Sequence, residues 1–523
     1  MASAEITSGG KRKTLSDKIV RNVVFGGLRS VVTAPVPFIL TPLILHKIGA
    51  VGYGTWAVFM AINGMTSLAD LGLMGTVSKF VAEHNANKDH VSLNRVLNTG
   101  FAVFGALSIV LVGVLWAGSS VVTAFLFRAN PASVPELTTL FRYFLIVIAA
   151  NILILLFSSV TTGLQRMDLT NIMTAFNTLS GALLGAMLLF RGWGLRGLLC
   201  GQICAAILTL FGYILLVGRL LPLIRINPMS VDTGEARKIF GFSLRFYFTQ
   251  AAVAVHNNVE KLLLALFVGV AAAGWYDIAN DVALKIRGAL GFVLGPVMPA
   301  ASELGAQGDD RRLLELYYRA HKYLAFLGLP VIGYVALVSG RFVALWIGPT
   351  FGIIALPLSV LVFINFVNLI TGPGFLIFVG NGNLGPGMRS ATLGISLNVV
   401  LSLILILRLG FTGAVAGTSI ALSAASLYFL HQFHSETGYP VGRLLREAYA
   451  RPFAWSVALA TVFYLVRSIF EPTWMGLVVE GILFGALYVL GLLFSSFFDQ
   501  YDWSKIERAV PLARHVKRMI SVA

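Results

Sequence analysis

The chain has 523 residues, of which 57% are hydrophobic and only 12% are charged. About a quarter of the residues in soluble domains are charged, so this composition excludes a string of soluble domains and predicts a helical bundle in a membrane. The net charge of +16 does not indicate nucleic acid as a partner, because membrane proteins gather Lys and Arg in cytoplasmic loops and no basic repeat interleaved with aromatics is present. The two cysteines, Cys200 and Cys204, share one apolar stretch, which excludes a disulfide framework and a zinc site.

Apolar stretches that reach the roughly 20 residues needed to cross a bilayer as a helix recur along the whole chain. They cover 22–45, 53–75, 96–118, 137–162, 170–190, 193–218, 239–270, 275–301, 323–346, 352–380, 387–407, 412–432, 452–470 and 474–497. The pair 170–190 and 193–218 is separated only by a short Gly-containing turn, which predicts a tight helical hairpin. The fold class is therefore all-α, a polytopic membrane protein with about 14 transmembrane helices.

The distribution of basic residues predicts the topology. With the N-terminus inside, the inner segments hold 26 of the 39 Lys and Arg residues, and the outer segments hold 7. This excess is what the positive-inside rule requires, and the inverted topology would violate the rule at almost every loop. We therefore expect both termini to lie in the cytoplasm.

A repeat underlies the spans. Residues 25–29 (FGGLR) open the first span and residues 240–245 (FGFSLR) open the seventh, and each of these spans ends at a Gly-rich turn with an aromatic. Six spans separate the two, so both halves enter the membrane in the same sense, which predicts two parallel six-helix lobes. The expected organisation is a cytoplasmic segment 1–21, an N-lobe 22–218, a linker 219–238, a C-lobe 239–432, a cytoplasmic loop 433–451, two extra C-terminal helices in 452–497 and a cytoplasmic tail 498–523.

Sequence motifs for enzyme chemistry are missing from the chain. It contains no ATP-binding GxxxxGK[ST] loop, no HExxH and no GxSxG. We therefore expect a transporter rather than an enzyme, with no cofactor and no metal. Any uphill transport would then draw on an ion gradient, the membrane potential or the substrate gradient.

Four groups of segments resemble one known family. They are 49–56 with 68–73 and 80–83, then 163–168, then 274–279 running to 299–303, and finally 397–401 with 413–419. In this order they resemble the polysaccharide-export branch of the multidrug/oligosaccharidyl-lipid/polysaccharide exporter superfamily, which contains O-antigen and exopolysaccharide flippases. The ordered set, rather than any single motif, carries the resemblance.

The resemblance implies two lobes around a central cavity that opens alternately to each side of a bacterial inner membrane. It implies a cargo of polyprenyl-pyrophosphate oligosaccharide moved from the cytoplasmic to the periplasmic leaflet. Membrane lipids and the polymerase and export machinery of the same pathway are the partners that it implies. In lipid-flipping relatives, basic residues on spans 1, 2 and 8 line the cavity; this chain has none within span 2.

The candidate substrate-binding residues follow from the charge of that cargo. A pyrophosphate that leaves water needs fixed cations, and ionisable residues at membrane depth usually face a cavity or a partner. Arg29 and Arg245 occupy equivalent places in the two repeats, where snorkelling to the inner interface is an equal alternative. Lys285 and Arg287 lie deeper, in span 8, and point nearly opposite ways. His256 and Asn257, in a polar triplet within span 7, are candidates for sugar binding.

Several acidic residues are candidates for ion coupling or for a switch. Asp277, Asp281 and Lys285 form one helical stripe, so Asp281 and Lys285 make either a structural ion pair or a switch that substrate phosphate or a proton opens. Glu260 beside Lys261 allows the same two interpretations, with a pair at the membrane interface favoured. Asp70 is interpreted first as a cap on local backbone amides and second as an ion site.

Two other function classes stay open beside the flippase. An ion-coupled antiporter of the multidrug kind would need unpaired acids at its centre, whereas the central charges of this chain are largely basic. A membrane enzyme such as a glycosyltransferase would need a large catalytic loop, and the sequence provides none.

Overall fold

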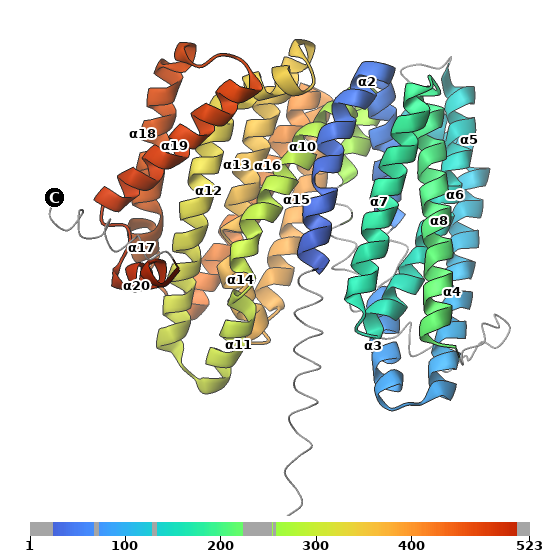
Figure 1. Cartoon of the computed structure of the whole chain (residues 1–523), viewed down its shortest axis with the longest axis horizontal. Helices are drawn as coiled ribbons and strands as arrows, with labels where there is room; N and C mark the ends of the chain where they lie inside the picture. The colour runs from blue at the N-terminus through green and yellow to red at the C-terminus, as the bar shows by residue number, and fades with distance from the viewer. Residues whose placement is uncertain (1–24, 67–72, 128–132, 223–253, 255–257, 510–523) are drawn as a thin grey trace, which may run out of the picture. The chain divides into compact units, whose positions relative to one another are not determined.

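The computed structural model describes residues 25–66, 73–127, 133–222, 254 and 258–509, and every regular element in them is a helix (Figure 1). Eleven helical segments of the described chain are long and apolar enough to cross a membrane. They are Phe25–Met65, His90–Ala117, Val134–Gly163, Met167–Phe190, Gly194–Leu220, Val270–Gln307, Asp310–Trp346, Pro349–Gly380, Gly385–Leu409, Phe411–Thr437 and Trp474–Phe494. The prediction of an all-α polytopic membrane protein is confirmed.

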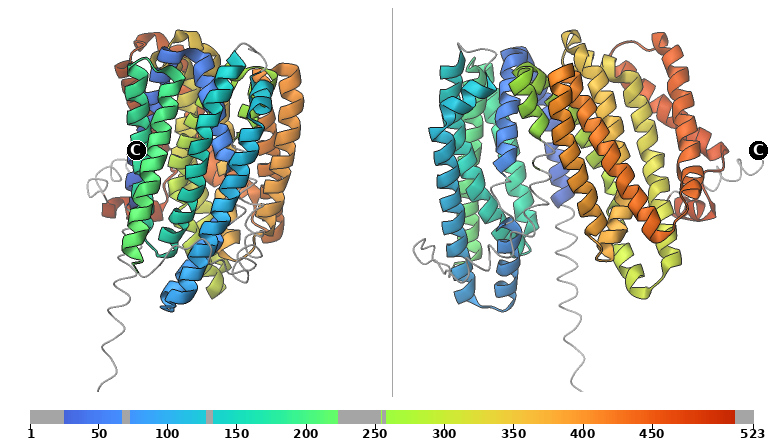
Figure 2. Two further views of the ribbon diagram at one scale, coloured as in Figure 1. Left: turned by 90° about the vertical axis from the view of Figure 1, so that its right-hand side faces the viewer. Right: turned by 180° about the vertical axis from the view of Figure 1, so that it is seen from behind.

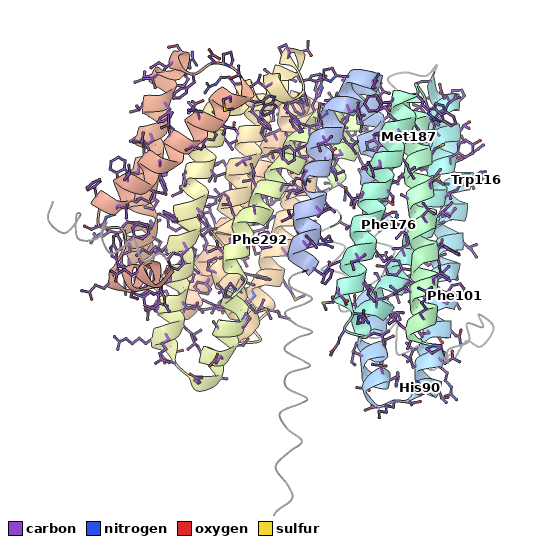
Figure 3. The ribbon with its side chains drawn as sticks, in the orientation of Figure 1. His90, Phe101, Trp116, Phe176, Met187 and Phe292 are labelled. Atoms are coloured by element: carbon purple, nitrogen blue, oxygen red, sulfur yellow. The ribbon has the colours of Figure 1, made fainter. Side chains whose placement is uncertain are left out.

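The chain divides into two compact units, residues 1–274 and 275–523. Unit 1 contains α2 (Pro35–Met65), α3 (Leu73–Ala86), α4 (His90–Ala117), α5 (Ser119–Leu126), α6 (Val134–Gly163), α7 (Met167–Phe190) and α8 (Gly194–Leu220). A further helical stretch covers residues 258–267. Apolar side chains on the outside of unit 1, such as Phe176 and Met187 of α7, are 43% and 49% exposed (Figure 3), as expected of a surface that faces lipid.

Unit 2 begins inside α10 (Val270–Gly291). It continues with η3 (Phe292–Leu294), α11 (Val297–Gln307), α12 (Asp310–Trp346), η4 (Pro349–Ile354), α13 (Ala355–Leu369), α14 (Gly372–Gly380), α15 (Gly385–Leu409) and α16 (Phe411–Thr437). Its last elements are α17 (Val441–Leu444), the π-helical turn η5 (Leu445–Tyr449), α18 (Ala450–Leu465), η6 (Arg467–Ile469), α19 (Trp474–Phe494) and α20 (Gln500–Ala509).

The eleven segments differ from the predicted fourteen spans at three places. The first two predicted spans run as one helical segment, Phe25–Met65, that bends at Gly49, whose φ of 71° lies in the left-handed region that favours glycine. The predicted span 239–270 lies largely outside the described residues. Helix α18 has 16 residues and rises only about 24 Å at 1.5 Å per residue, which is short for a crossing.

Glycine lets the helices of each hairpin approach closely. Helices α7 and α8 form the hairpin predicted from the sequence, and a Cβ atom on Gly201 would lie 2.4 Å from the backbone nitrogen of Gly185. Helices α15 and α16 lie side by side along their length (Figure 2), and a Cβ on Gly413 would lie 2.1 Å from the backbone oxygen of Leu405. Small residues at such interfaces let lipid-embedded helices pack backbone to backbone.

Helix α12 ties the C-terminal helices to unit 2. The Nη2 atom of Arg341 on α12 donates to Oε1 of Glu480 on α19 at 2.8 Å, and Ser456 Oγ on α18 donates to the backbone oxygen of Leu329 at 2.7 Å. Glu480 is fully buried, so this ion pair is shielded from solvent. Helices α18 and α19 are therefore packed parts of unit 2.

A second set of ionic contacts attaches α20 to the other end of α12. Asp502, which is 3% exposed, accepts from Lys322 Nζ and from the Tyr323 hydroxyl, the latter at 2.7 Å. Arg319 Nη1 lies 3.4 Å from Asp499 Oδ2, and the backbone N–H of Asp502 donates to Asp499 Oδ1 at 2.9 Å. We call these five residues the α12–α20 clasp.

The clasp makes a pH-dependent prediction. Burial alone would raise the pKa of Asp499, but the N–H of Asp502 and the charges of Lys322 and Arg319 outweigh burial and lower that pKa below its ordinary value. A carboxylate with a lowered pKa stabilises the folded state above its ordinary pKa of about 3.9, and this contribution is lost as the pH falls below that value. We expect limited proteolysis at α20 to accelerate as the pH falls below about 4, and Lys322→Gln to accelerate it already at pH 7. Equal cleavage rates of wild type and Lys322→Gln at pH 7 would contradict the assignment.

Candidate functional site

Helix α10 carries the central charges of unit 2. Lys285 Nζ donates to both carboxylate oxygens of Asp281, at 2.7 Å and 2.9 Å. This is the i, i+4 ion pair expected from the sequence, with the acid N-terminal to the lysine as helices favour. The side chains stay accessible, at 27% exposure for Lys285 and 41% for Asp281. Asp277, one turn earlier on the stripe, is half-buried and has a polar or electrostatic partner of its own.

Arg287 has a different environment from Lys285. Its Nη2 atom donates to the side-chain oxygen of Asn368 on α13 at 2.8 Å, and Asn368 Nδ2 donates to Ser426 Oγ on α16 at 3.2 Å. Two residues along a helix correspond to a rotation of about 200°, which separates the two cations as the sequence analysis expected. In the described residues no carboxylate lies within ion-pair distance of Arg287, so a neutral amide holds its charge.

The other candidate residues fall in unit 1 or outside the described residues. Arg29 is half-buried and makes no side-chain hydrogen bond or ion pair with the described part of the chain. Glu260 is 1% exposed and is therefore buried within unit 1. Both Glu260 and Lys261 have polar or electrostatic partners. Arg245, His256, Asn257 and Asp70 lie outside the described residues.

The helix that carries Glu260 packs closely against α2. A Cβ atom on Gly64 would lie 2.7 Å from Nδ2 of Asn258, and Asn151 Nδ2 on α6 donates to Asn63 Oδ1 on α2 at 3.0 Å. Polar side chains from three helices therefore meet inside unit 1 near Glu260. The amide pair links two helices that are otherwise surrounded by apolar side chains.

A polar node in unit 2 unites three of the segments that carry the family resemblance. The hydroxyl groups of Tyr276, from 274–279, and Thr418, from 413–419, lie 2.9 Å apart. Asn398, from 397–401, donates to Thr418 Oγ1 at 3.5 Å. All three side chains are at most 3% exposed. We call this group the Tyr276 node; it joins α10, α15 and α16.

The node is not fully satisfied by the described residues. The side-chain oxygens of Asn398 and Ser402, one turn apart on α15, are buried and have no hydrogen-bond partner in the described chain. Buried polar groups are normally paired, so two unpaired oxygens beside one node mark it as unusual. Tyr276, Asn398 and Thr418 lie in segments that carry the family resemblance, but they were not predicted from the sequence as functional residues. The feature of the sequence that could have identified them is the occurrence of polar side chains within apolar spans.

Among the described residues, no group of three or more His, Cys, Asp or Glu side chains that could hold a metal ion occurs. The arrangement instead provides one accessible ion pair, one cation held by an amide and one buried hydroxyl–amide node. Such groups can bind an anion or respond to charge, but they are not set up for bond cleavage.

The Tyr276 node predicts a specific loss of stability. Tyr276→Phe removes one hydroxyl and with it the buried contact to Thr418, and the loss of one such hydrogen bond costs about 0.5–1.5 kcal/mol. We expect a lower thermal unfolding temperature for the purified variant in detergent. Tyr428→Phe is the matched control, because Tyr428 on α16 is 38% exposed. Equal unfolding temperatures for the two variants would show that the node contributes nothing.

Comparison with solved structures identifies the fold. A structure titled lipid II flippase MurJ, in an inward closed conformation, matches with a TM-score of 0.73 at 16% identity, covering 90% of this chain and 98% of that one. A multidrug MATE family transporter in an inward-facing conformation matches with a TM-score of 0.59 at 15% identity, over 78% of this chain and 98% of the other. At these identities the matches establish the fold alone.

Comparison with curated proteins gives distant relatives of similar length. The uncharacterized membrane protein EpsK of Bacillus subtilis is 23% identical over 472 residues, covering 86% of this chain and 90% of the relative. The probable flippase AglR of Haloferax volcanii is 22% identical over 399 residues, covering 74% of this chain and 78% of the relative. The family model described as polysaccharide biosynthesis protein matches residues 19–304, more than half of the chain. The chain therefore belongs to the polysaccharide biosynthesis protein family, a family of multi-pass membrane transporters and not of enzymes.

Proposed function

We propose that this protein is a flippase that moves polyprenyl-pyrophosphate-linked oligosaccharide from the cytoplasmic to the periplasmic leaflet of a bacterial inner membrane by alternating access. The proposal includes about 14 spans, two parallel six-helix lobes around a central cavity and two cytoplasmic termini. The family match supports a role in polysaccharide biosynthesis, and AglR, a relative over most of the chain, is named as a flippase. Partners in the same pathway, such as a polymerase, belong to the proposal as well.

The observation that carries the proposal is the environment of Arg287. A charged residue at the centre of a membrane helix costs about 2.5–3.5 kcal/mol on insertion scales, so a retained cation indicates a use. Asn368 orients the guanidinium at 2.8 Å without neutralising it. A positive charge that is held in place but not cancelled suits the transient binding of a pyrophosphate, which is negatively charged and accepts forked hydrogen bonds.

The Asp281–Lys285 pair fits the role of a switch. Both carboxylate oxygens hold the ammonium group, yet the two side chains are 41% and 27% exposed, so an incoming anion can reach the lysine. A phosphate that displaces Asp281 would exchange one ion pair for another at small net cost. We propose that Lys285 binds the pyrophosphate after this exchange and that Arg29 and Arg245 add charge from the two repeats.

The remaining candidates have roles of their own in the proposal. His256 and Asn257 would contact the sugar, and Asp277, Glu260 and Asp70 would take part in ion coupling. Two of these three acids, Asp277 and Glu260, lie in the described part of the chain, and both have polar or electrostatic partners. A multidrug-type antiporter needs unpaired acids for organic cations, and this requirement disfavours that alternative although its fold is shared.

The first test is a leaflet-accessibility assay in liposomes that hold purified protein and a polyprenyl-pyrophosphate oligosaccharide. We expect Arg287→Gln to slow flipping about tenfold or more, because a hydrogen bond to a charged group contributes about 1.5–3 kcal/mol. Arg408→Gln is the matched control, because Arg408 is an exposed arginine in the last turn of α15. Wild-type rates for Arg287→Gln would remove this residue from the mechanism while leaving the flippase assignment standing. No flipping by wild type under any ion gradient would contradict the proposed function itself.

The switch makes a separate prediction for Asp281. Asp281→Asn frees Lys285 from its partner, so we expect tighter binding of a pyrophosphate-bearing lipid and slower flipping, because release becomes the slow step. Lys285→Gln should weaken binding of the same lipid. Both affinities can be measured by competition with a fluorescent lipid pyrophosphate in detergent. An unchanged affinity in Asp281→Asn would identify the ion pair as structural.

A further inference from the structure

A buried polar cluster lies in unit 2 where α12, α16 and the π-helical turn η5 meet. Tyr317 and His321, one turn apart on α12, are both fully buried. His321 Nδ1 lies 2.7 Å from the hydroxyl of Tyr449, and the Tyr317 hydroxyl lies 3.1 Å from Nε2 of His434. None of these residues belongs to the charged site on α10. We call them the His321 cluster.

Hydrogen-bond logic fixes the proton positions on one of the two histidines. His434 Nδ1 lies 2.8 Å from the backbone oxygen of Tyr439, which can only accept. His434 Nδ1 therefore carries hydrogen, and in the neutral ring Nε2 accepts from the Tyr317 hydroxyl. Protonation of His434 would make Nε2 a donor as well, and the Tyr317 hydroxyl would then have to rotate and accept.

One ring nitrogen of His321 has a hydrogen-bond partner, and the other has none among the described residues. Its Nε2 atom is buried and has no hydrogen-bond partner in the described residues. The nearest ring is that of Tyr317, whose centroid lies 4.4 Å from that of His321 in an edge-on arrangement. Burial raises the pKa of Tyr449 well above its ordinary value, so the hydroxyl that faces Nδ1 stays protonated. A second N–H on His321 would have no acceptor.

A cation on His321 would have no carboxylate partner among the described residues. The titratable and charged groups that face the cluster are Tyr317 and Tyr318 on α12, Asp310 at the start of α12, His434 on α16, Tyr439 in the following turn, and Arg443, Glu447 and Tyr449 in α17 and η5. Glu447 is paired with Arg443 at 3.0 Å, and Arg443 lies over the ring of Tyr318. In the described chain no carboxylate makes an ion pair with His321, and burying an unpaired charge is costly.

We propose that His321 is a proton-binding site that takes up a proton only when the segment Val441–Tyr449 moves away from α12. The proton adds to the lone pair of the neutral imidazole, giving an imidazolium ion that water can then solvate. In the packed arrangement the ring stays neutral. Protons therefore favour an open arrangement of this part of unit 2, and the effect does not depend on the cargo.

The segment has the features of a movable element. It follows Gly438, which ends α16 with a φ of 69°, and it contains a π-helical turn, an irregularity that interrupts the regular backbone pattern of a helix. One polar contact holds it to α12, the Tyr449–His321 bond, and the bond from the Tyr318 hydroxyl to the backbone oxygen of Pro440 at 3.0 Å holds the residue just before it. Release of the first contact would free the Nδ1 side of His321, which faces Tyr449.

The sign of the effect follows from linkage. In the open arrangement His321 recovers an ordinary pKa of about 6.5, whereas the packed arrangement binds no proton there. Above pH 6.5 neither state is protonated, and the packed state keeps its full stability. Below pH 6.5 the ratio of open to packed states rises about tenfold per pH unit for one proton taken up.

A labelling experiment tests the proposal on the full-length protein. Ala448→Cys, in a chain whose Cys200 and Cys204 are replaced by Ala, places a thiol on η5 at a position that is 1% exposed. Its reaction with dithiodipyridine, normalised to the denatured protein at each pH, measures opening. We expect the normalised rate to rise about tenfold per unit between pH 6.5 and pH 5. In His321→Gln the increase of the normalised labelling rate with falling pH should disappear, or the rate should rise about tenfold less per pH unit than in wild type.

The controls separate His321 from its neighbours and from general acid effects. His431→Gln removes an exposed histidine from α16 and should leave the rise unchanged. Tyr449→Phe removes the hydroxyl partner and keeps His321, so opening should increase at every pH while the slope remains. A wild-type slope in His321→Gln, or no slope in wild type, would overturn the proposal.

If His321→Gln does not fold, carbon NMR of wild type labelled on histidine decides instead. The His321 signal, assigned from its shift in Tyr449→Phe, should not titrate near pH 6.5 while the packed state dominates. A normal titration in that state would overturn the proposal. Because neither readout uses lipid flipping, failure here is distinguishable from failure of the proposed function.

Discussion

A polar group inside an apolar helical bundle must find its partner within the protein, because lipid offers none. This constraint explains where the helices of each unit are joined by polar contacts in addition to apolar packing. Arg341 reaches Glu480 to join α12 to α19, and Arg287 reaches Asn368 to join α10 to α13. The Tyr276 node joins α10, α15 and α16. Each contact fixes the rotation of a helix about its own axis, which apolar packing alone leaves loosely determined.

The same constraint separates structural charges from functional ones. Arg341 and Glu480 neutralise each other inside unit 2, where the Glu480 side chain is fully buried and the Arg341 side chain is 22% exposed. Arg287 is oriented by an amide and keeps its charge, while Lys285 shares its charge with an accessible carboxylate. A transporter of an anionic lipid needs groups of the second kind, because a cation that is fully neutralised cannot attract cargo and one that is too strongly exposed cannot release it.

Features that depend on the spacing of nearby residues could be predicted from the sequence. The Gly-containing turn at 191–193 predicted the α7–α8 hairpin, and the spacing of Asp281 and Lys285 predicted their ion pair. Contacts between distant residues, such as Tyr276 with Thr418, depend on how helices pack and were not predicted. The described residues give eleven segments against fourteen predicted spans, and one of the eleven, Phe25–Met65, bends at Gly49 and covers most of the first two predicted spans.

The α12–α20 clasp has a consequence for shortened versions of this protein. Asp502 and Asp499 are the carboxylates nearest to Lys322, which lies on α12 within reach of both. A chain cut before residue 499 would leave Lys322 beside Arg319, with Glu315 as the neighbouring acid paired to the arginine at 2.7 Å. Two adjacent cations would then share one anion at the end of the longest helix in unit 2. A shortened version of this protein should therefore extend at least to Ala509, so that Asp499 and all of α20 with Asp502 are kept.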